Sequence, residues 1–319
     1  MNGTLTDVAG LKVGHYSDVE HGTGVTVVLA DAGATAGVEV CGTAVGSREF
    51  LTLDPRHSAR QVHAICLAGG SAFGLAAADG VMKFLEERGV GYNVLVTKVP
   101  IVPAAIIFDL SFKDHRVRPD AVMGYRACLG ATSDAVPEGS VGAGAGAAVG
   151  KLLGPANAMK GGVGSASRVS GSGATVGALA VVNNFGDVLD RRTGKIMAGC
   201  RDPKGGFYDV ARRLAEMKNL PDPFLLRGTN LVVVATDAEL SKPQAGKVAS
   251  MAAAGLARTL SPAHATFDGD VVFCLSAGNR PGELNQLGVL AAEAVAEAIN
   301  RAVEKADGLG VLPAYKDLS

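Results

Sequence analysis

The sequence predicts one α/β domain, and three observations support this prediction. The apolar run His63–Gly70, HAICLAGG, ends in two glycines and is followed at once by apolar residues at three- and four-residue steps, which is typical of a strand, a turn and an amphipathic helix. Further apolar runs of strand length occur along the chain, together with other helical patterns. At 319 residues, one core can bury roughly three quarters of the unfolded surface.

The first third contains the elements of that unit. Two short strands are expected at 25–30 and 36–46, before the run that ends in glycines. The helix that follows has its apolar residues between 75 and 85 on one face. It ends at Gly89, because a glycine can adopt the left-handed conformation that stops a helix.

The middle of the chain is rich in glycine and proline. Pro100 and Pro103 interrupt an apolar run, which places them at a sheet edge or a bend and leaves 104–110 as the buried segment. A helix is expected near 119–129. The glycine-dense tract 139–178 is expected to form loops and tightly packed strands, because the apolar runs beside it are too strong for a disordered linker.

The last third is expected to hold a modest helix, an exposed connection containing prolines, and then two strands that alternate with two helices. The first of these two helices begins at Ser241, because Gln244 three residues later completes a capping-box pattern. In chain order, the segments are 208–217, 219–227, 231–236, the helix from Ser241, 271–275 and 284–303.

Composition and charge exclude several function classes. The formal net charge is -1, and no stretch combines basic with aromatic residues, so nucleic acid is not an expected partner. No apolar run approaches the roughly 20 residues that span a bilayer, and the first residues lack a basic segment before an apolar one. The five cysteines contain no C-x-x-C pair, as expected for core residues in a reducing compartment. We therefore expect a cytoplasmic protein that does not bind membranes.

No metal or organic cofactor is expected. None of the six histidines falls in a metal-ligand spacing, so each is interpreted as a surface or core residue. The tract GAGAAVG before Lys151 is not a phosphate loop, since its first glycine is misplaced and Leu152 stands where Ser or Thr is needed. GAGAAVG and GSGATVG also miss the dinucleotide fingerprint. Ser71 lacks the flanking pattern of a hydrolase elbow and is interpreted as a helix cap.

A Gly-Thr step at the entrance of an apolar strand is the main candidate for chemistry. In LLRGTNLVVVATD, Gly228 precedes Thr229. A threonine at this place is ordinarily just a strand former. If its hydroxyl attacks the Gly228 carbonyl and the chain breaks, the same residue acquires an α-amine, whose ordinary pKa of about 8 lets it accept the hydroxyl proton. We interpret the step as the self-cleavage point of a hydrolase.

Other polar residues could complete such a site. Asp268 and Asp270, in TFDGD, point to one face of an extended segment and could hold an ammonium and a hydroxyl; the alternative is a polar turn. Calcium is not favoured, because the other oxygen ligands of a calcium loop are missing. Asn183 and Asn184 end the buried run ALAVV and could donate to an oxyanion; the alternative is a pair of turn-forming asparagines.

Five motifs in the same order, ICLAGGSAFGL, the Lys151 tract, VVNNFGDV, GTNLVVVATD and TFDGD, resemble the L-aminopeptidase/D-esterase family. This family includes β-aminopeptidases and endo-type 6-aminohexanoate (nylon) oligomer hydrolases, and the resemblance covers most of the chain. It implies a single-domain precursor that cuts itself into a large subunit, 1–228, and a small subunit, 229–319. It also implies a four-layer αββα sandwich, similar to other N-terminal nucleophile hydrolases but connected differently, and a homotetramer of cleaved heterodimers.

The resemblance assigns a role to each candidate residue. Thr229 matches the nucleophile, Asp268 and Asp270 the acidic pair that orients it, Asn183 the oxyanion or positioning amide, and Lys151 the active-site lysine.

The threonine with two aspartates resembles the nylon-oligomer branch more than the serine-type β-aminopeptidases. One position departs from the family: its tyrosine is Phe108 here, in IIFDL, so a hydrogen bond from that phenol to the transition state is lost. We expect Phe108 and Asn184 to contact the substrate.

The expected function is amide or peptide hydrolysis of the aminopeptidase type, on a small amide or a short peptide and without a cofactor. Endo-type hydrolysis of 6-aminohexanoate oligomers is the first alternative. Acyl transfer of the ornithine acetyltransferase type is the second, together with an unprocessed and inactive homologue, which the phenylalanine at position 108 makes conceivable.

Overall fold

The computed structural model describes residues 1–219 and 227–318. Within these residues, nine strands form one sheet, in which eight follow the order β10-β11-β14-β16-β2-β4-β7-β3 and the ninth, β1, pairs with β2 outside this order. Their bounds are β1 (Lys12–Asp18), β2 (Thr23–Val40), β3 (Ser47–Arg48), β4 (Val62–Ala68), β7 (Ala104–Ile106), β10 (Gly162–Val169), β11 (Thr175–Asn183), β14 (Thr229–Ala238) and β16 (Val271–Arg280). Shorter strands lie outside this sheet: β5 (Tyr92–Asn93), β6 (Lys98–Val99), β8 (Ala148–Val149), β9 (Met159–Lys160), β12 (Asp187–Leu189), β13 (Ile196–Ala198) and β15 (Leu260–Ser261).

The long strand β2 belongs to both halves of this sheet. Its residues 25–29 pair with β1 and β4, whereas its residues 35–40 pair with β16. The sequence predicted two separate strands here, at 25–30 and 36–46, and this prediction was wrong. The exposed residues Asp31 and Ala32 mark the place where one continuous strand passes from one half of the sheet to the other, not a turn.

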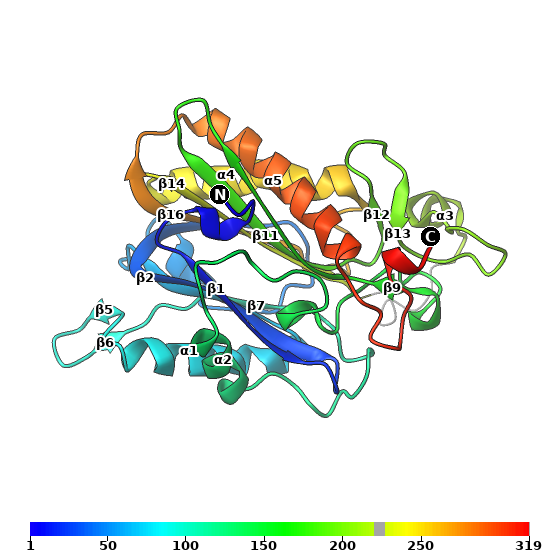
Figure 1. The fold of residues 1–319 in the computed structure, drawn as a ribbon, viewed down its shortest axis with the longest axis horizontal. Helices are drawn as coiled ribbons and strands as arrows, with labels where there is room; N and C mark the ends of the chain where they lie inside the picture. Colours follow the sequence, from blue (N-terminus) through cyan, green and yellow to red (C-terminus); the bar gives the residue numbers. More distant parts are fainter. Residues whose placement is uncertain (220–226, 319) are drawn as a thin grey trace.

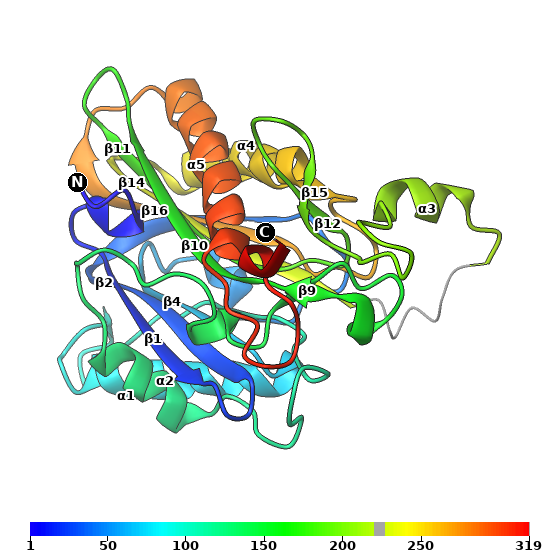
Figure 2. The same ribbon diagram turned by 45° about the vertical axis from the view of Figure 1, so that its right-hand side comes forward.

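Helices cover both outer faces of the stacked sheet halves. α4 (Lys242–Thr259) and α5 (Leu284–Glu304) lie on the half that contains β10, β11, β14 and β16, whereas α1 (Ala77–Glu86) and α2 (Ala121–Leu129) lie on the half that contains β1 and β4 (Figures 1 and 2). The order of layers is therefore helix, sheet, sheet, helix. This order confirms the predicted four-layer αββα sandwich.

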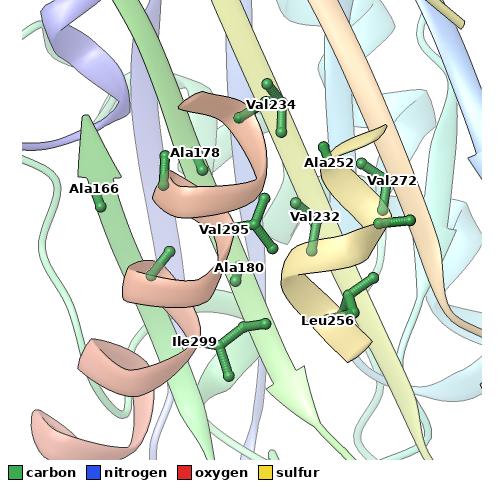
Figure 3. Close-up of a cluster of buried hydrophobic side chains, with 14 of the residues drawn as sticks. Ala166, Ala178, Ala180, Val232, Val234, Ala252, Leu256, Val272, Val295 and Ile299 are labelled. Atoms are coloured by element: carbon green, nitrogen blue, oxygen red, sulfur yellow. The ribbon is translucent and has the colours of Figure 1, made fainter. Parts of the chain in front are cut away.

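Small side chains allow these layers to pack closely. Figure 3 shows alanines and valines of β11 and β14, among them Ala178 and Val232, facing Val295 and Ile299 on α5. At Gly164 on β10, a Cβ would stand 2.0 Å from the carbonyl oxygen of Ala298, so α5 lies directly on the strand backbone. A second apolar layer separates the two sheet halves, and a third lies under α1 and α2. The low aromatic content of the sequence fits this packing.

Most predicted helices are present, with boundaries moved by a few residues. α4 begins after Ser241, whose amide donates to Gln244 Oε1 at 2.9 Å, as the capping box predicted. The modest helix is α3 (Val210–Glu216). The interpretation of Ser71 as a helix cap was wrong, because it begins a 3-10 turn with φ at +53° and its side chain makes no capping hydrogen bond.

The predicted cleavage point lies at the start of a strand whose two neighbours come from opposite sides of it in the sequence. β14, which begins at Thr229, pairs with β11 on one side and with β16 on the other. A break before Thr229 would therefore leave two interleaved fragments. Most of the predicted connection 219–227 lies outside the described residues, which resume at Arg227. In the described part of the chain, no helix has the length and apolar character needed to span a bilayer.

Candidate active site

Thr229 is buried at the first position of β14, beside the end of β11. Asn183 is its partner across that ladder, and Gly228 forms a bridge to Asp268. Thr229 Oγ1 donates to the carbonyl oxygen of Gly228 at 2.5 Å, and the amide of Gly269 donates to the same oxygen at 3.2 Å. The hydroxyl thus lies beside the carbonyl group that the sequence predicts it to attack, and a backbone donor lies on that carbonyl oxygen.

Only glycine fits at position 228. A Cβ there would stand 2.2 Å from Asp268 Oδ1 and 2.5 Å from the amide nitrogen of Phe185. Both separations are far below van der Waals contact, so any side chain would push the backbone away from Thr229. The small residue allows the Gly228–Thr229 peptide to approach the buried carboxylate closely.

Asp270 is fully buried and is held from two directions. Its Oδ1 accepts from the amide and the Nδ2 of Asn230, at 2.9 and 2.8 Å. Its Oδ2 accepts from the amide of His264 at 3.3 Å and lies 3.2 Å from the Nδ1 of the same residue. The aspartate therefore fixes the residue directly after Thr229, which orients the start of β14.

Sequence reasoning missed Asn230 and His264. The signal for Asn230 was a polar residue at the second position of an otherwise apolar strand, where a buried amide needs partners. Its Nδ2 also donates to Asn184 Oδ1 at 3.0 Å, and its Oδ1 accepts from the amide of Asn183 at 3.2 Å. For His264, which was interpreted as an ordinary surface or core residue, neither spacing nor patterning pointed to the site.

Asp268 is buried, and neither of its carboxylate oxygens has a hydrogen-bond partner among the described residues. Burial raises the pKa of Asp268 well above its ordinary value, and the charge of Asp270 raises it further. The charge of Lys151 and the nearby amide of Phe185, which does not reach hydrogen-bond geometry, act in the opposite direction. A cation placed beside this carboxyl group would stabilise its charged form.

Lys151 is buried next to Asn183, and its ammonium group has three acceptors. Its Nζ donates to Asn183 Oδ1 at 2.8 Å, to the Asn183 carbonyl at 3.1 Å and to the Arg227 carbonyl at 3.0 Å. Burial lowers the pKa of Lys151 to about 7, although the carboxylates of Asp268 and Asp109 act in the opposite direction. This lysine can therefore gain or lose a proton near neutral pH.

Asn183 connects Lys151 to the segment after β7 that carries Phe108. Its Oδ1 also accepts from the amide of Ala148 at 3.0 Å, and its Nδ2 donates to the carbonyl of Phe108 at 3.1 Å. In the uncut chain the amide therefore positions its neighbours, and its role as an oxyanion donor stays a prediction. Asn184 is fully buried with an unpartnered Nδ2 among the described residues, so substrate contact by this residue also stays a prediction.

Two cavities adjoin these residues. The first, of about 370 Å³, contains Thr229 and Gly228 and is also lined by Ser71, Phe108, Arg227 and other residues. The second, of about 460 Å³, contains Lys151 and Asn183, and it has mainly apolar walls. Phe108, predicted to contact substrate, lines both cavities, and so does Arg227.

Asp109, which sequence reasoning also missed, lies in the wall of the second cavity. Its Oδ1 accepts from the amide of Gly70 at 2.6 Å, and its Oδ2 accepts from Thr23 Oγ1 at 2.8 Å. Burial raises its pKa to about 6, and these two hydrogen bonds limit the rise. A charged residue directly after the buried run AAIIF was the signal that could have identified it.

The described residues contain no group of three or more His, Cys, Asp or Glu side chains arranged to hold a metal ion. The site instead brings together a hydroxyl, two carboxylates, a lysine and three asparagines, and all of these side chains are buried. Such a set can supply a nucleophile, a proton acceptor and hydrogen-bond donors for acyl chemistry. Every residue that the sequence assigned to the site lies in this region.

Comparison with known proteins finds relatives over most of the chain. A model of Peptidase family S58 matches residues 3–312. The chain is 42% identical to an uncharacterised aminopeptidase of Mycobacterium leprae over 98% of this chain and 93% of that protein. It is 30% identical to a 6-aminohexanoate-oligomer endohydrolase of Kocuria sp., over 93% of this chain and 85% of that protein.

The fold is similar to that of a solved aminopeptidase. The L-aminopeptidase D-Ala-esterase/amidase of Ochrobactrum anthropi, described as a variant of the Ntn hydrolase fold, superposes with a TM-score of 0.74. The alignment covers 99% of this chain and 92% of that one, at 20% identity. This likeness confirms the predicted fold class.

Proposed function

The chain belongs to peptidase family S58 and is a hydrolase of amide bonds, and we propose that it makes its own nucleophile by cutting the bond between Gly228 and Thr229. The observation that carries this proposal is the position of Thr229 Oγ1, 2.5 Å from the carbonyl oxygen of Gly228, with the Gly269 amide on the same oxygen. To attack, this hydroxyl would turn from the carbonyl oxygen to the neighbouring carbonyl carbon, while the Gly269 amide stays on the oxygen where negative charge develops.

The self-cleavage proceeds in two steps. Thr229 Oγ1 attacks the Gly228 carbonyl carbon, the Gly269 amide stabilises the oxyanion, and the C–N bond breaks as the threonine nitrogen takes a proton. Lys151, whose pKa is lowered to about 7, accepts the hydroxyl proton through water when it is in its neutral form, because no α-amine exists yet. Water then opens the ester, which leaves a carboxylate on Gly228 and a free amine on Thr229.

Turnover repeats the same chemistry on a substrate amide. The α-amine of Thr229 takes the hydroxyl proton, Oγ1 attacks the substrate carbonyl, and the leaving amine receives the proton as the C–N bond breaks. Water hydrolyses the acyl ester and regenerates Thr229. Asp268 and Asp270 hold the new N-terminus in place, and Asn183 helps to stabilise the oxyanion.

The experiment is denaturing mass spectrometry of freshly folded protein. Wild type is expected to give two fragments, 1–228 and 229–319, whose masses together equal the full chain plus one water. Thr229→Ala is expected to give one uncut, folded and inactive chain, whereas Thr229→Ser, which keeps a hydroxyl, is expected to be cut. Two fragments from the alanine variant, or a single full-length mass from wild type, would overturn the proposal.

Two kinds of substrate are compatible with this mechanism. An aminopeptidase removes an N-terminal residue, whereas an endohydrolase cuts inside a chain such as a 6-aminohexanoate oligomer. The second form is favoured by a cavity of about 460 Å³ that continues beyond the Thr229 cavity. A panel of aminoacyl p-nitroanilides assayed against 6-aminohexanoate oligomers separates the two.

Assembly and location complete the proposal. We propose a homotetramer of cleaved heterodimers in the cytoplasm, on the basis of the family resemblance and of five cysteines without a C-x-x-C pair. Light scattering coupled to size exclusion tests the tetramer, and a stable monomer of 32.2 kDa in total would contradict it.

A further inference from the structure

The two cavities meet at Phe108 and Arg227, the two residues that line both of them. The Arg227 guanidinium stands 5.6 Å from the centroid of the Phe108 ring, and the Arg227 carbonyl accepts from Lys151 Nζ at 3.0 Å. The backbone directly before the scissile bond therefore occupies the boundary between the cavities.

The backbone of the uncut chain indicates where the acyl group of a substrate would lie. The Gly228 carbonyl lies beside Thr229 Oγ1, and the next carbonyl upstream, that of Arg227, lies on Lys151. Beyond this point is the cavity of about 460 Å³, with apolar walls that include Phe112, Ala158 and Leu312.

The charged groups in that wall already have partners inside the protein. Asp109 is held by Gly70 and Thr23, and Lys151 has two of its three acceptors on Asn183. The third acceptor of Lys151, on Arg227, is the one that moves when the cut chain end leaves. A substrate that enters must replace it, because an unpaired hydrogen-bond donor on a buried group is unfavourable.

On the basis of the self-cleavage proposed above, we infer that Arg227 and Gly228 of the uncut chain occupy the place that becomes the acyl subsite of the mature enzyme. In that subsite the carbonyl one residue upstream of the scissile amide accepts from Lys151, and the rest of the acyl chain lies in the cavity beyond Phe108. The substrate class is an N-acylated or internal amide with an extended, mainly apolar acyl chain. A free N-terminal amine would bring a donor to the place where Lys151 needs an acceptor.

Four p-nitroanilides test this inference on wild-type enzyme. They are glycyl, N-acetylglycyl, N-hexanoylglycyl and pentanoyl p-nitroanilide, the last having the length of N-acetylglycyl without its upstream carbonyl. We expect kcat/KM for N-acetylglycyl to exceed that for glycyl and for pentanoyl by about tenfold or more, as a hydrogen bond to a charged donor predicts. N-hexanoylglycyl should be better still, because its chain reaches the apolar cavity.

A variant at the cavity mouth tests the path of the chain. Ala156 lines the cavity and is exposed, so Ala156→Phe should fold and narrow the entrance. The ratio of kcat/KM for N-hexanoylglycyl to that for N-acetylglycyl is expected to fall by about fivefold or more, in line with the lost burial of several methylene groups. Ala135→Phe, at an exposed position outside both cavities, is the matched control and should keep the wild-type ratio.

The outcomes separate this inference from the proposed function. An uncut chain that hydrolyses none of the four anilides would overturn the self-cleavage proposal itself. A cut and active enzyme that prefers glycyl p-nitroanilide, or that treats N-acetylglycyl and pentanoyl alike, would overturn only the acyl subsite. An unchanged ratio in Ala156→Phe would overturn the path beyond Phe108.

Discussion

Two buried lysines, nine residues apart, differ in what holds them. Lys160 is fully buried, and its Nζ donates to the carbonyls of Gly144, Ala147 and Gly161, at 2.8, 2.9 and 3.0 Å. Lys151 also has three acceptors, but they lie on Asn183 and on Arg227. Burial lowers the pKa of both lysines to about 7.

The difference shows that burial and a lowered pKa alone do not identify a catalytic group. All three acceptors of Lys160 are backbone carbonyls of one glycine-rich tract, and none belongs to a residue next to the proposed cleavage point. One acceptor of Lys151 belongs to Arg227, the residue before Gly228, and the other two belong to Asn183, the residue paired with Thr229. We therefore interpret Lys160 as a structural hydrogen-bond donor that joins loop carbonyls, and Lys151 as part of the proposed reaction.

Replacing each lysine by methionine should give the largest effects, on self-cleavage at Lys151 and on stability at Lys160. Lys151→Met is expected to slow self-cleavage by about 10² to 10⁴, the usual contribution of a group that transfers a proton, and turnover appears only as fast as the chain is cut. Lys160→Met should leave three buried carbonyls without their donor and destabilise the protein by about 3 kcal/mol or more. The cut fraction from mass spectrometry, anilide turnover and urea unfolding measure these effects.

The folded fraction of Lys160→Met should be cut and should turn over substrate at near the wild-type rate. If instead this variant folds well and is inactive, or if Lys151→Met is cut normally, then the assignment of the two lysines is reversed. Lys151→Arg and Lys160→Arg serve as companions, since each keeps a cation with a different shape.

Much of the fold could be predicted from the sequence, because its elements have local signals. The capping box at Ser241 and the apolar run from Leu231 act through neighbours in the chain, and both elements are where the pattern predicts them. The single strand β2 could not be predicted, because its exposed centre resembles a turn. What keeps it extended is pairing with strands distant in sequence, first β4 and then β16.

The site also contains residues that the sequence could identify and residues that it could not. Thr229, Asp268 and Lys151 stand out through a motif, and the structure brings all three to one region. Arg227 and Gly269 do not stand out, since their roles depend on backbone carbonyl and amide groups rather than on side chains. Such roles arise only from the tertiary path of the chain, and periodicity does not report them.

A substitution at Gly228 should change the hydrogen bonding of Lys151 without changing that of Lys160. In Gly228→Ala the new Cβ would meet Asp268 Oδ1 at 2.2 Å, so the scissile peptide and the Arg227 carbonyl must shift. We expect self-cleavage to slow by about tenfold to a hundredfold, since displacement of a reacting group by about 1 Å has this effect. A time course of the cut fraction measures it.

The matched control is Gly171→Ala, where a Cβ would meet no atom within 4 Å and φ is not in the left-handed region. That variant should be cut at the wild-type rate. Equal cutting of both variants would show that close packing at position 228 has no part in the reaction.

The pH dependence of the free energy of unfolding tests whether both lysines have a lowered native pKa. Each native pKa is lowered from 10.5 to about 7. Between these values the unfolded chain binds the proton and the native chain does not, so each lysine makes stability rise with pH in this window. In a Thr229→Ala background, which keeps the chain uncut, Lys151→Met and Lys160→Met should each reduce that slope by about 1.4 kcal/mol per pH unit. Urea unfolding between about pH 7.5 and 9.5 measures the slope, and an unchanged slope in either variant contradicts that lysine's lowered pKa.

The smallest effect is expected from Asp109, whose charge raises the pKa of both lysines. Asp109→Asn removes that charge while keeping the size of the side chain, so the pKa of both lysines should fall further. The rising limb of self-cleavage rate against pH, which reports the loss of the Lys151 proton, should move to lower pH by less than about one unit. A shift to higher pH would mean that Asp109 affects Lys151 through hydrogen bonding to the loop around Gly70 and not through its charge.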